Sequence, residues 1–430
     1  MIRRTLGFFS IALALLAGCQ NGQTVDAPLA PSTVPIAAAS PAAMPSPTAA
    51  PTSGSPTAAP LPTSIAATEP PATAPPDQAP APTTIVPPAD PLQVPDGFGV
   101  GVFQAKLRGP RMLALGPDGA IYAAERGAGR VVRLPDRDGD GLADGVEPVA
   151  DNLDAPSSLA FFEDGSLYVA ETTRVLRLGA PDGQGVFGER ATVIDGLPDG
   201  GHNTRTLLFS PDWSTLYVSV GSSCNVCAED DERRASIMAY SPDGSGGRVH
   251  AKGLRNAVGL AWRPGGAELW ATNNGRDLLG DDQPPETVNA VTGPGLDFGW
   301  PRCHADRISD PEFGGAQACD GVAAPAVEMQ AHSAPLGLAF GAATAFPEPY
   351  RSGLFVAFHG SWNRSEPTGY KVVFIPLDGD KAGPVRDFAA GWLKADGTVW
   401  GRPVDVLAGA DGSLYVSDDA GGVIYRIFRK

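Results

Sequence analysis

Polar side chains stand directly before four apolar segments of the chain. The runs are Gly201-His202-Asn203-Thr204-Arg205, Gly253-Leu254-Arg255-Asn256, Ala331-His332-Ser333-Ala334 and Gly401-Arg402-Pro403. An imidazole titrates near neutral pH and suits general base catalysis, and a guanidinium can hold a carboxylate through two hydrogen bonds. We therefore expect these residues to meet in one polar site. A cluster of solvated loop residues is the alternative.

A second set of polar residues has the spacing of a calcium-binding loop. Oxygen-bearing side chains stand at positions 1, 3, 5, 9 and 12 of one run, with glycine at position 6: Asp136, Asp138, Asp140, Asp144, Glu147 and Gly141. No helical pattern flanks this run, so we expect a structural calcium site in a loop between strands. A solvated acidic turn is the alternative.

Four of the five cysteines lie in the C-terminal half of the chain. An even number in an exported protein predicts two disulfides, most simply Cys224 with Cys227 and Cys303 with Cys319. The Cys224-Asn-Val-Cys227 spacing also occurs in redox and zinc motifs, and these interpretations stay open. A c-type haem site is excluded because Ala228 stands where such a site requires histidine.

The elements that must position these residues form a repeat. Each copy has a small or polar opening, an apolar pair, a turn and a short alternating strand, and Asp-Gly between such runs indicates a hairpin. The six copies are anchored at Leu113, Leu159, Leu207, Leu260, Leu338 and Val406. Units of roughly 40–50 residues with several strands are typical of propeller blades, and the longer steps leave room for inserted loops.

The sequence therefore predicts an all-β fold, a six-bladed β-propeller over residues 96–430, with the segment 98–107 completing the last blade. Frequent Gly and Pro and scarce i, i+3, i+4 apolar spacing argue against a helical solenoid. In a propeller the loops before the inner strands converge at the mouth of the central channel. The polar runs described above stand at those positions.

The N-terminal part of the chain is of a different kind. Residues 1–18 carry Arg3 and Arg4 before an apolar stretch too short to span a bilayer, and Leu16-Ala17-Gly18-Cys19 resembles a bacterial lipoprotein signal in which Cys19 is acylated. An ordinary signal peptide is the alternative. Residues 19–95 hold 20 of the 43 prolines and should form a disordered tether. We expect an exported protein, anchored through lipid at Cys19 to the outer face of a bacterial membrane.

The net charge of the chain indicates which classes of binding partner are unfavourable. The chain has 32 Lys and Arg against 48 Asp and Glu, a net charge of −16. Phosphate backbones are bound by clustered basic side chains, so this acidity argues against a nucleic-acid partner. Part of the negative charge lies in residues 136–147 and 281–286, where bound calcium would neutralise it.

Taken together, the motifs resemble those of the glucose/sorbosone dehydrogenase family, whose members are soluble six-bladed aldose dehydrogenases dependent on pyrroloquinoline quinone (PQQ). The resemblance rests on Gly201-His202-Asn203, Ser222-Ser223-Cys224-Asn225-Val226-Cys227, Gly253-Leu254-Arg255-Asn256, Gly299-Trp300-Pro301, His332-Ser333-Ala334-Pro335 and His359-Gly360-Ser361-Trp362-Asn363-Arg364. These motifs occur in order and span essentially all of residues 96–430. The resemblance implies oxidation of an aldose or a sorbosone-like substrate.

The resemblance also implies roles for individual residues. His202 matches the general base, which takes the proton of the substrate hydroxyl while hydride passes to the quinone. Arg255 and Asn256 match residues that contact the quinone, and Arg402 matches a further contact. The remaining candidate cofactor contacts are Arg205, His332 and Arg364, with His359 a close competitor of Arg364.

A calcium ion (Ca2+) beside the quinone is a further implication of the resemblance. In the family, this ion is bound partly through backbone carbonyls. The matching segment here contains Gly275 and Arg276, and the acidic loop after it contains Asp281, Asp282 and Glu286. Hard oxygen ligands suit calcium, which would act as a Lewis acid on the quinone. From the residues alone, a solvated acidic loop is the alternative.

Two positions depart from the family pattern. Pro156-Ser157-Ser158 stands where the best-known members carry a glutamine contact, and Gly201 stands where an acidic residue commonly precedes the base. The substrate stays open among glucose, another aldose, sorbosone and a non-sugar alcohol, and the electron acceptor is unidentified. The main alternative function is a propeller that has lost the quinone and binds a sugar polymer or a protein. A metal-dependent lactonase-like hydrolase ranks last, because this centre offers arginines and histidines instead of carboxylates.

Overall fold

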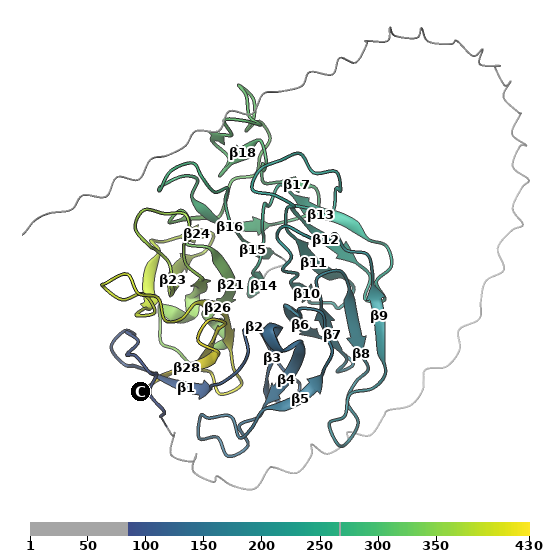
Figure 1. Ribbon diagram of the computed structural model, residues 1–430, viewed down its shortest axis with the longest axis vertical. Helices are drawn as coiled ribbons and strands as arrows, with labels where there is room; N and C mark the ends of the chain where they lie inside the picture. Colours follow the sequence, from purple (N-terminus) through teal and green to yellow (C-terminus); the bar gives the residue numbers. More distant parts are fainter. Residues whose placement is uncertain (1–84, 266–267) are drawn as a thin grey trace, which may run out of the picture. The chain divides into compact units, whose positions relative to one another are not determined.

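Six β-sheets surround a central channel like the blades of a propeller (Figure 1). The computed structural model describes residues 85–265 and 268–430. Within these residues, regular structure consists of strands and three short 3-10 helices, η1 (Arg126–Ala128), η2 (Gly341–Ala343) and η3 (Tyr350–Ser352). The predicted six-bladed β-propeller is confirmed. The competing helical solenoid, which the sequence already disfavoured, is excluded.

The first three blades follow the chain. Blade 1 contains β2 (Pro110–Leu115), β3 (Ile121–Glu125), β4 (Arg130–Leu134) and β5 (Glu147–Ala150). Blade 2 contains β6 (Ser158–Phe161), β7 (Leu167–Ala170), β8 (Val175–Leu178) and β9 (Arg190–Ile194). Blade 3 contains β10 (Leu207–Phe209), β11 (Leu216–Val220), β12 (Ser236–Tyr240) and β13 (Arg248–Lys252), to which β17 (Leu296–Asp297) adds a parallel edge.

The last three blades carry the insertions. Blade 4 contains β14 (Leu260–Trp262), β15 (Leu269–Asn273), β16 (Glu286–Val291) and β20 (Val327–Met329), and its inserted loop holds the small hairpin β18 (Cys303–His304) and β19 (Ile308–Ser309). Blade 5 contains β21 (Pro335–Phe340), β22 (Gly353–Phe358), β23 (Lys371–Asp378), β24 (Lys381–Ala382) and β25 (Arg386–Ala389). Blade 6 contains β26 (Pro403–Ala408), β27 (Leu414–Asp418), β28 (Val423–Arg429) and β1 (Phe98–Gln104).

Blade 6 closes the ring with strands from both ends of the propeller region. β1 pairs antiparallel with β28, from Phe98 opposite Arg429 to Gln104 opposite Ile424. This confirms the prediction that the segment after residue 98 completes the last blade. Packing begins earlier than the predicted boundary between residues 95 and 96, since the Gln93 N–H donates to the Ala390 carbonyl at 2.7 Å.

Asp-Gly turns set the hairpins between first and second strands. In blade 2, Asp164 accepts a 2.8 Å bond from the Ser166 N–H, and Gly165 has a φ of +83°. That left-handed backbone is open to glycine at little cost. In blade 3, Trp213 takes the equivalent place with a φ of +60°. The repeat noticed in the sequence is therefore a repeat of turn geometry.

Side chains on the first and second strands of one blade, or just before them, bond to the inner-strand region of a neighbouring blade. The Ser157 hydroxyl donates to the Arg205 carbonyl at 2.8 Å, Thr206 to Val258 at 2.5 Å, Thr272 to Leu336 at 2.7 Å and Ser417 to Arg111 at 2.7 Å. The Asp405 carboxylate accepts from the Leu113 N–H at 2.8 Å. These bonds satisfy buried backbone groups and hold the inner strands in register across blade boundaries.

An apolar cluster closes the channel partway along its length. Met112, Val258, Leu336 and Val404 come from the starts of four inner strands and pack together, each less than 7% exposed. We call this cluster the plug. It separates the end of the channel that precedes the inner strands, here called the mouth, from the opposite end.

The predicted signal peptide, Cys19 and most of the tether lie outside the described residues. Among the residues that the structure describes, no helix is long and apolar enough to cross a bilayer.

Candidate active site

The predicted site residues meet at the mouth because each precedes an inner strand. His202 stands before β10, Arg255 and Asn256 before β14, and Arg402 before β26. Gly221 lies between two of these segments, since a Cβ added there would be 2.5 Å from His202 Cβ and 2.9 Å from Asn256 Oδ1. The base candidate and Asn256 are therefore neighbours.

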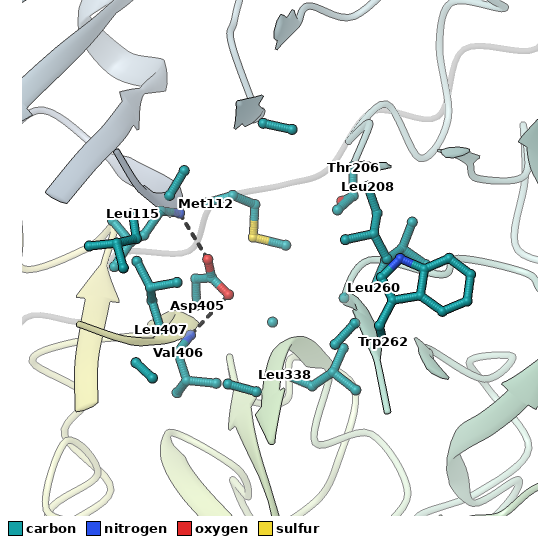
Figure 2. A pocket seen from close by; sticks show the side chains of 18 of the residues that line it. Met112, Leu115, Thr206, Leu208, Leu260, Trp262, Leu338, Asp405, Val406 and Leu407 are labelled. Carbon is teal, nitrogen blue, oxygen red and sulfur yellow. Dashed lines mark hydrogen bonds between the residues drawn. The ribbon is translucent and has the colours of Figure 1, made fainter. Parts of the chain in front are cut away.

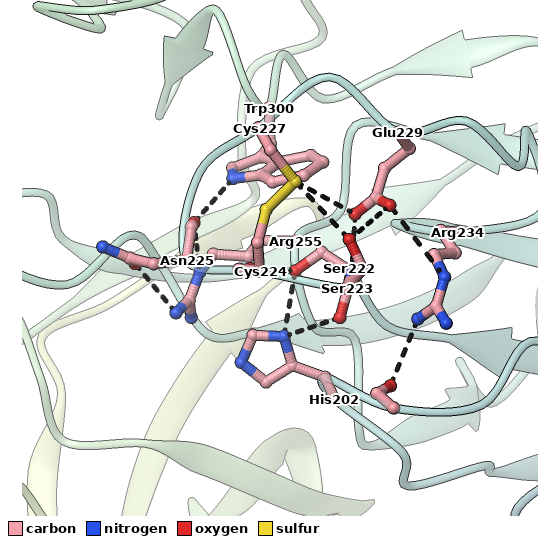
Figure 3. Close-up of a disulfide and its surroundings, with 11 residues drawn as sticks. His202, Ser222, Ser223, Cys224, Asn225, Cys227, Glu229, Arg234, Arg255 and Trp300 are labelled. Carbon is pink, nitrogen blue, oxygen red and sulfur yellow. Dashed lines mark hydrogen bonds and ion pairs between the residues drawn. A yellow bond between two sulfur atoms is a disulfide. The ribbon is translucent and has the colours of Figure 1, made fainter. Parts of the chain in front are cut away.

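His202 is held through one ring nitrogen. Its Nδ1 lies 2.9 Å from Ser222 Oγ and 3.1 Å from the Ser222 carbonyl oxygen. Figure 3 shows the other ring nitrogen pointing away from these partners. Burial, together with the nearby charge of Arg255, lowers the pKa of His202 to about 4 against the opposing bond to Ser222. The imidazole is therefore neutral near pH 7, as a general base must be.

Arg255 lies near the base with its donors engaged. Its guanidinium donates to the Asn225 carbonyl at 2.9 Å, to the Gly275 carbonyl at 2.7 Å and to Asp277 at 2.6 Å, and only 4% of the residue is exposed. Burial lowers the pKa of Arg255, and Asp277 opposes this. By contrast, the buried Asn256 Oδ1 has no hydrogen-bond partner among the described residues. A bound ligand with a suitable donor would satisfy it.

A second charged group lies on the blade 5 and blade 6 side of the mouth. Arg402 donates to the carbonyls of His359 and Gly360, both at 3.0 Å. His359 Nε2 lies 2.9 Å from Asp419, which also accepts from Arg111 at 2.7 Å. Burial raises the pKa of Asp419, but the bond to His359 and the charge of Arg111 outweigh it and hold the value at about 2. Asp419 is therefore an ionised acceptor at the mouth.

Arg205 has a role other than the predicted cofactor contact. Its side chain is completely buried, and its guanidinium donates to the carbonyls of His202 at 2.9 Å, Thr204 at 2.9 Å and Pro198 at 2.5 Å. These bonds fix the backbone of the loop that carries the base. Arg205 thus supports His202 from below and does not face the mouth.

Arg364 and His332 both contact the loop that follows Arg276. Arg364 donates to the Asp281 carbonyl and pairs with Asp282 at 3.0 Å, while His332 Nε2 lies 2.7 Å from the Gly280 carbonyl. These two candidate cofactor contacts therefore tie blade 5 to the acidic loop of blade 4.

The structure brings together only part of the predicted calcium set beside the quinone. The Gly275 N–H donates to Glu286 at 2.6 Å, and Glu286 also accepts from the Ala334 N–H at 3.2 Å. Burial raises the pKa of Glu286 to about 7. The carboxylates of Asp281 and Asp282 instead contact Ser365 and Arg364. The Arg276 side chain reaches away to Asp310 and Glu312.

The predicted calcium loop is also assembled in part. The carboxylates of Asp136, Asp138 and Asp140 have oxygens within 4.8 Å of one another. The buried Asp136 Oδ1 has no hydrogen-bond partner among the described residues. Asp144 accepts from the Arg137 N–H at 2.6 Å, and Glu147, on β5, pairs with Arg133 at 2.6 Å and with Arg137. The last two predicted ligands thus lie outside the cluster.

Both predicted disulfides are confirmed. Cys224 is bonded to Cys227, and Cys303 to Cys319. The oxidised pair at Cys224 and Cys227 offers no thiolates to zinc. Three residues at the site carry contacts that sequence reasoning missed: Ser222, Asn225 and Asp277. Ser222 and Asn225 belong to the motif Ser222–Cys227, and this motif was the sequence signal that could have identified them as site residues.

A large apolar cavity lies at the other end of the channel. It has a volume of about 720 Å³ and is lined by apolar side chains such as Leu208, Leu260, Leu338 and Leu407 (Figure 2). Asp405 is its one charged lining residue among those described, and burial raises the pKa of this carboxyl to about 7. The plug separates this cavity from His202, so the cavity is not part of the candidate active site.

Fold and site thus define a six-bladed propeller whose channel mouth holds a neutral histidine among arginines. The chain belongs to the TrAA12-like family, whose model matches residues 92–430. It is 28% identical over 352 residues to an uncharacterized protein of Borreliella burgdorferi, which covers 78% of this chain and 90% of the relative. It is 26% identical over 414 residues to a pyrroloquinoline quinone-dependent pyranose dehydrogenase of Coprinopsis cinerea, covering 79% of this chain and 54% of that enzyme. This chain thus spans about half the length of the fungal enzyme.

Solved structures share the fold. The holo form of the pyranose dehydrogenase PQQ domain from Coprinopsis cinerea has a TM-score of 0.69 at 23% identity, covering 80% of this chain and 98% of that domain. The calcium structure of the Trichoderma reesei carbohydrate-active enzyme family AA12 protein has a TM-score of 0.68 at 20% identity, covering 82% of this chain and all of that one. The recognised kinship with quinone-dependent sugar dehydrogenases is confirmed.

Proposed function

We propose that this protein is a PQQ- and calcium-dependent dehydrogenase that oxidises an aldose or a sorbosone-like sugar, with His202 as the general base. The observation that carries the proposal is the neutral His202 held at the mouth through Nδ1, with its second nitrogen directed away from its protein partners. The family and the quinone-dependent fungal relatives support it. When bound, the quinone would supply the hydride acceptor.

The residues present at the mouth fit such a cofactor. Within residues 85–265 and 268–430, Asn256 offers a buried oxygen without a partner, and Arg402 uses only Nε and Nη2 for protein carbonyls, which leaves Nη1 for a ligand carboxylate. Arg255 would place positive charge beneath a ligand oxygen. These residues would bind and orient the cofactor, while His202 would accept the hydroxyl proton at its second ring nitrogen.

Calcium in this site would use hard oxygens of the Gly275 segment. The Gly275 carbonyl now accepts from Arg255 at 2.7 Å, and the Glu286 carboxyl is 2.6 Å from the Gly275 N–H. A cation at the carbonyls of Gly275 and Arg276 would lie close to Glu286 as a counter-charge. The calcium structure of the fungal family member supports calcium as the metal of this proposal.

The central test is reconstitution of the full chain. Added PQQ and calcium should produce dye-linked oxidation across an aldose panel, and quinone binding should quench Trp fluorescence. Dye reduction without quinone, or the absence of both binding and reduction, would contradict the proposal. Sugar binding without quinone binding would favour the alternative of a non-catalytic sugar-binding propeller.

The low pKa of His202 predicts an acid-resistant activity. Because His202 must be neutral to accept a proton, activity should fall only as the pH drops towards its pKa of about 4, well below the usual histidine value. We expect kcat/KM to stay level through pH 6 and to decline below about pH 5. A pH profile with saturating quinone measures this. An acid limb centred at pH 6.5 would contradict it.

We also propose that Asp136, Asp138 and Asp140 bind a structural calcium ion. Their clustered oxygens repel one another, and the buried Asp136 Oδ1 lacks a partner among the described residues, so a cation would relieve both costs. Calcium should raise the Tm, and Asp138→Asn should reduce that rise. Asp243→Asn, in the β12–β13 turn, is the matched control. An equal calcium effect on both variants would contradict the assignment.

The proposed location follows from the N-terminal signal alone. We place the propeller outside the cell membrane, anchored through lipid on Cys19, with a small sugar and an unidentified electron acceptor as partners. Cys19→Ala should move the protein from the membrane fraction to the soluble fraction. Retention in the membrane would contradict the anchor.

A further inference from the structure

The loop closed by the Cys224–Cys227 disulfide touches both halves of the candidate site. Figure 3 shows the disulfide together with His202, which contacts Ser222, and Arg255, which contacts Asn225. Among the residues that the structure describes, Cys224 to Ala228 make no hydrogen bond from backbone to backbone. The loop conformation therefore depends on the disulfide and on side-chain bonds.

Ser222, just before the disulfide, determines where the proton of His202 lies. A serine hydroxyl has one proton, and Ser222 Oγ donates it to the Cys224 carbonyl at 2.6 Å. Towards His202 Nδ1, 2.9 Å away, the same oxygen can only accept. The Ser222 carbonyl at 3.1 Å is a second acceptor facing Nδ1. Nδ1 must therefore carry the proton, and Nε2 keeps the lone pair that a general base needs.

Asn225, inside the disulfide loop, determines where the Arg255 guanidinium lies. Its carbonyl accepts from Arg255 Nε at 2.9 Å, and its Oδ1 accepts from Arg255 Nη2 at 3.0 Å. The same Oδ1 accepts from the Asp277 N–H at 2.8 Å, and Nδ2 donates to the Asp277 carbonyl at 3.1 Å. Trp300 Nε1 adds a bond to the Asn225 carbonyl at 3.2 Å. One residue thus fixes the guanidinium from two sides.

We propose that the disulfide loop is the shared positioning element of this site: Ser222 selects the tautomer of His202, Asn225 orients Arg255, and the Cys224–Cys227 bond holds both residues in place. The inference rests on the proposed function for its catalytic consequence, because only a proton-accepting His202 needs a fixed tautomer. Its structural part concerns this chain's own residues and is testable without quinone.

The first test reads the tautomer directly. In the full chain with 15N-labelled histidine, the ring nitrogens of the five histidines report which nitrogen carries the proton, and the spectrum of His202→Gln identifies the His202 signals. Wild-type protein should show Nδ1–H at His202. Ser222→Ala removes one of the two acceptors that face Nδ1 and should therefore lower the Nδ1–H fraction, and Cys224→Ser combined with Cys227→Ser should lower it as well. An unchanged Nδ1–H signature in both variants would overturn the proposal.

Cys303→Ser combined with Cys319→Ser is the matched control. It opens the other disulfide, which holds the insertion of blade 4, and should leave the His202 signals unchanged. A tautomer mixture in this control as well would show general loosening and would also overturn the proposal. Circular dichroism confirms that each variant is folded before its spectrum is compared.

The second test distinguishes the role of Ser222 from the role of Asn225. Asn225→Ala should weaken quinone binding by roughly ten- to hundred-fold while the His202 signals stay as in wild type, since second-layer contacts typically have effects of that size. Ser222→Ala should instead lower kcat by a similar factor with little change in KM. If wild-type protein fails to bind quinone, the proposed function fails, and the tautomer test still decides the positioning role of the loop. Equal effects of both variants on quinone affinity would contradict the division of roles.

Discussion

His202→Ala is expected to lower kcat for dye-linked sugar oxidation by about 10²–10⁴-fold, the range that general base catalysis supplies. His202 stands at the mouth with a ring nitrogen directed away from its protein partners. The Nδ1 side of the ring contacts Ser222, whose bonds to Cys224 and Arg255 do not depend on the imidazole. The variant should therefore fold and bind quinone normally.

The control for this prediction is His250→Ala. His250 lies on β13, where its ring packs edge-on against Tyr217 at 4.9 Å, remote from the mouth. This variant should lose stability and keep its kcat. Measurements at saturating quinone and sugar separate a lost base from a lost ligand. Activity of His202→Ala within about threefold of wild type would remove His202 from the mechanism, because a general base contributes at least 10².

Asp277→Ala is expected to have the largest effect on stability. Asp277 is the carboxylate partner of Arg255, at 2.6 Å, and also accepts from Asn363 at 3.0 Å. Removing it leaves a buried guanidinium without its counter-charge, which typically costs about 3–5 kcal/mol. For a domain of this size that corresponds to a fall in Tm of roughly 5–10 °C. Differential scanning calorimetry of the full chain measures it.

Asp380→Ala is the matched comparison. Asp380 also pairs with an arginine, Arg263, at the same 2.6 Å distance, but its side chain is 90% exposed. Water screens such a pair, so its removal should leave the Tm nearly unchanged. Similar Tm values for the two variants would show that Arg255 gains no stability from Asp277. Both ion pairs have the same length and differ in burial, and Arg263 in addition keeps Glu268 as a partner at 3.0 Å.

The fold was predictable from the sequence because turn-forming residues recur at equivalent positions of the repeat. Asp-Gly pairs with left-handed glycine recur at the same place in blades 1, 2 and 6, Asp212-Trp213 takes that place in blade 3, and these turns are local properties of the sequence. The order of His202, Arg255 and Arg402 around the ring follows directly from that repeat, since each precedes an inner strand. The order of site residues around the propeller can therefore be predicted from the sequence whenever the blade repeats can be aligned.

The direction of individual side chains was not predictable in the same way. Arg205 belongs to the same run as His202, yet its guanidinium is buried against three backbone carbonyls. Glu147 fits the calcium pattern, yet arginines on its own blade take its carboxylate. The competing arginines of Glu147 lie on the neighbouring strand and in the loop before β5, whereas the loop around Arg205 folds back so that carbonyls within seven residues accept from its guanidinium. Spacing alone carries no information about such competition.

The plug of Met112, Val258, Leu336 and Val404 makes the channel a blind pocket with respect to the site. Sugar, oxidised product and electron acceptor would then share a single doorway. An acceptor could approach the cofactor only after the product had left, so turnover would proceed as two alternating half-reactions. In steady-state kinetics such alternation gives parallel double-reciprocal lines, the pattern of a ping-pong enzyme. The order in which product leaves and electron acceptor binds would thus be determined by a few apolar side chains that take no part in the chemistry.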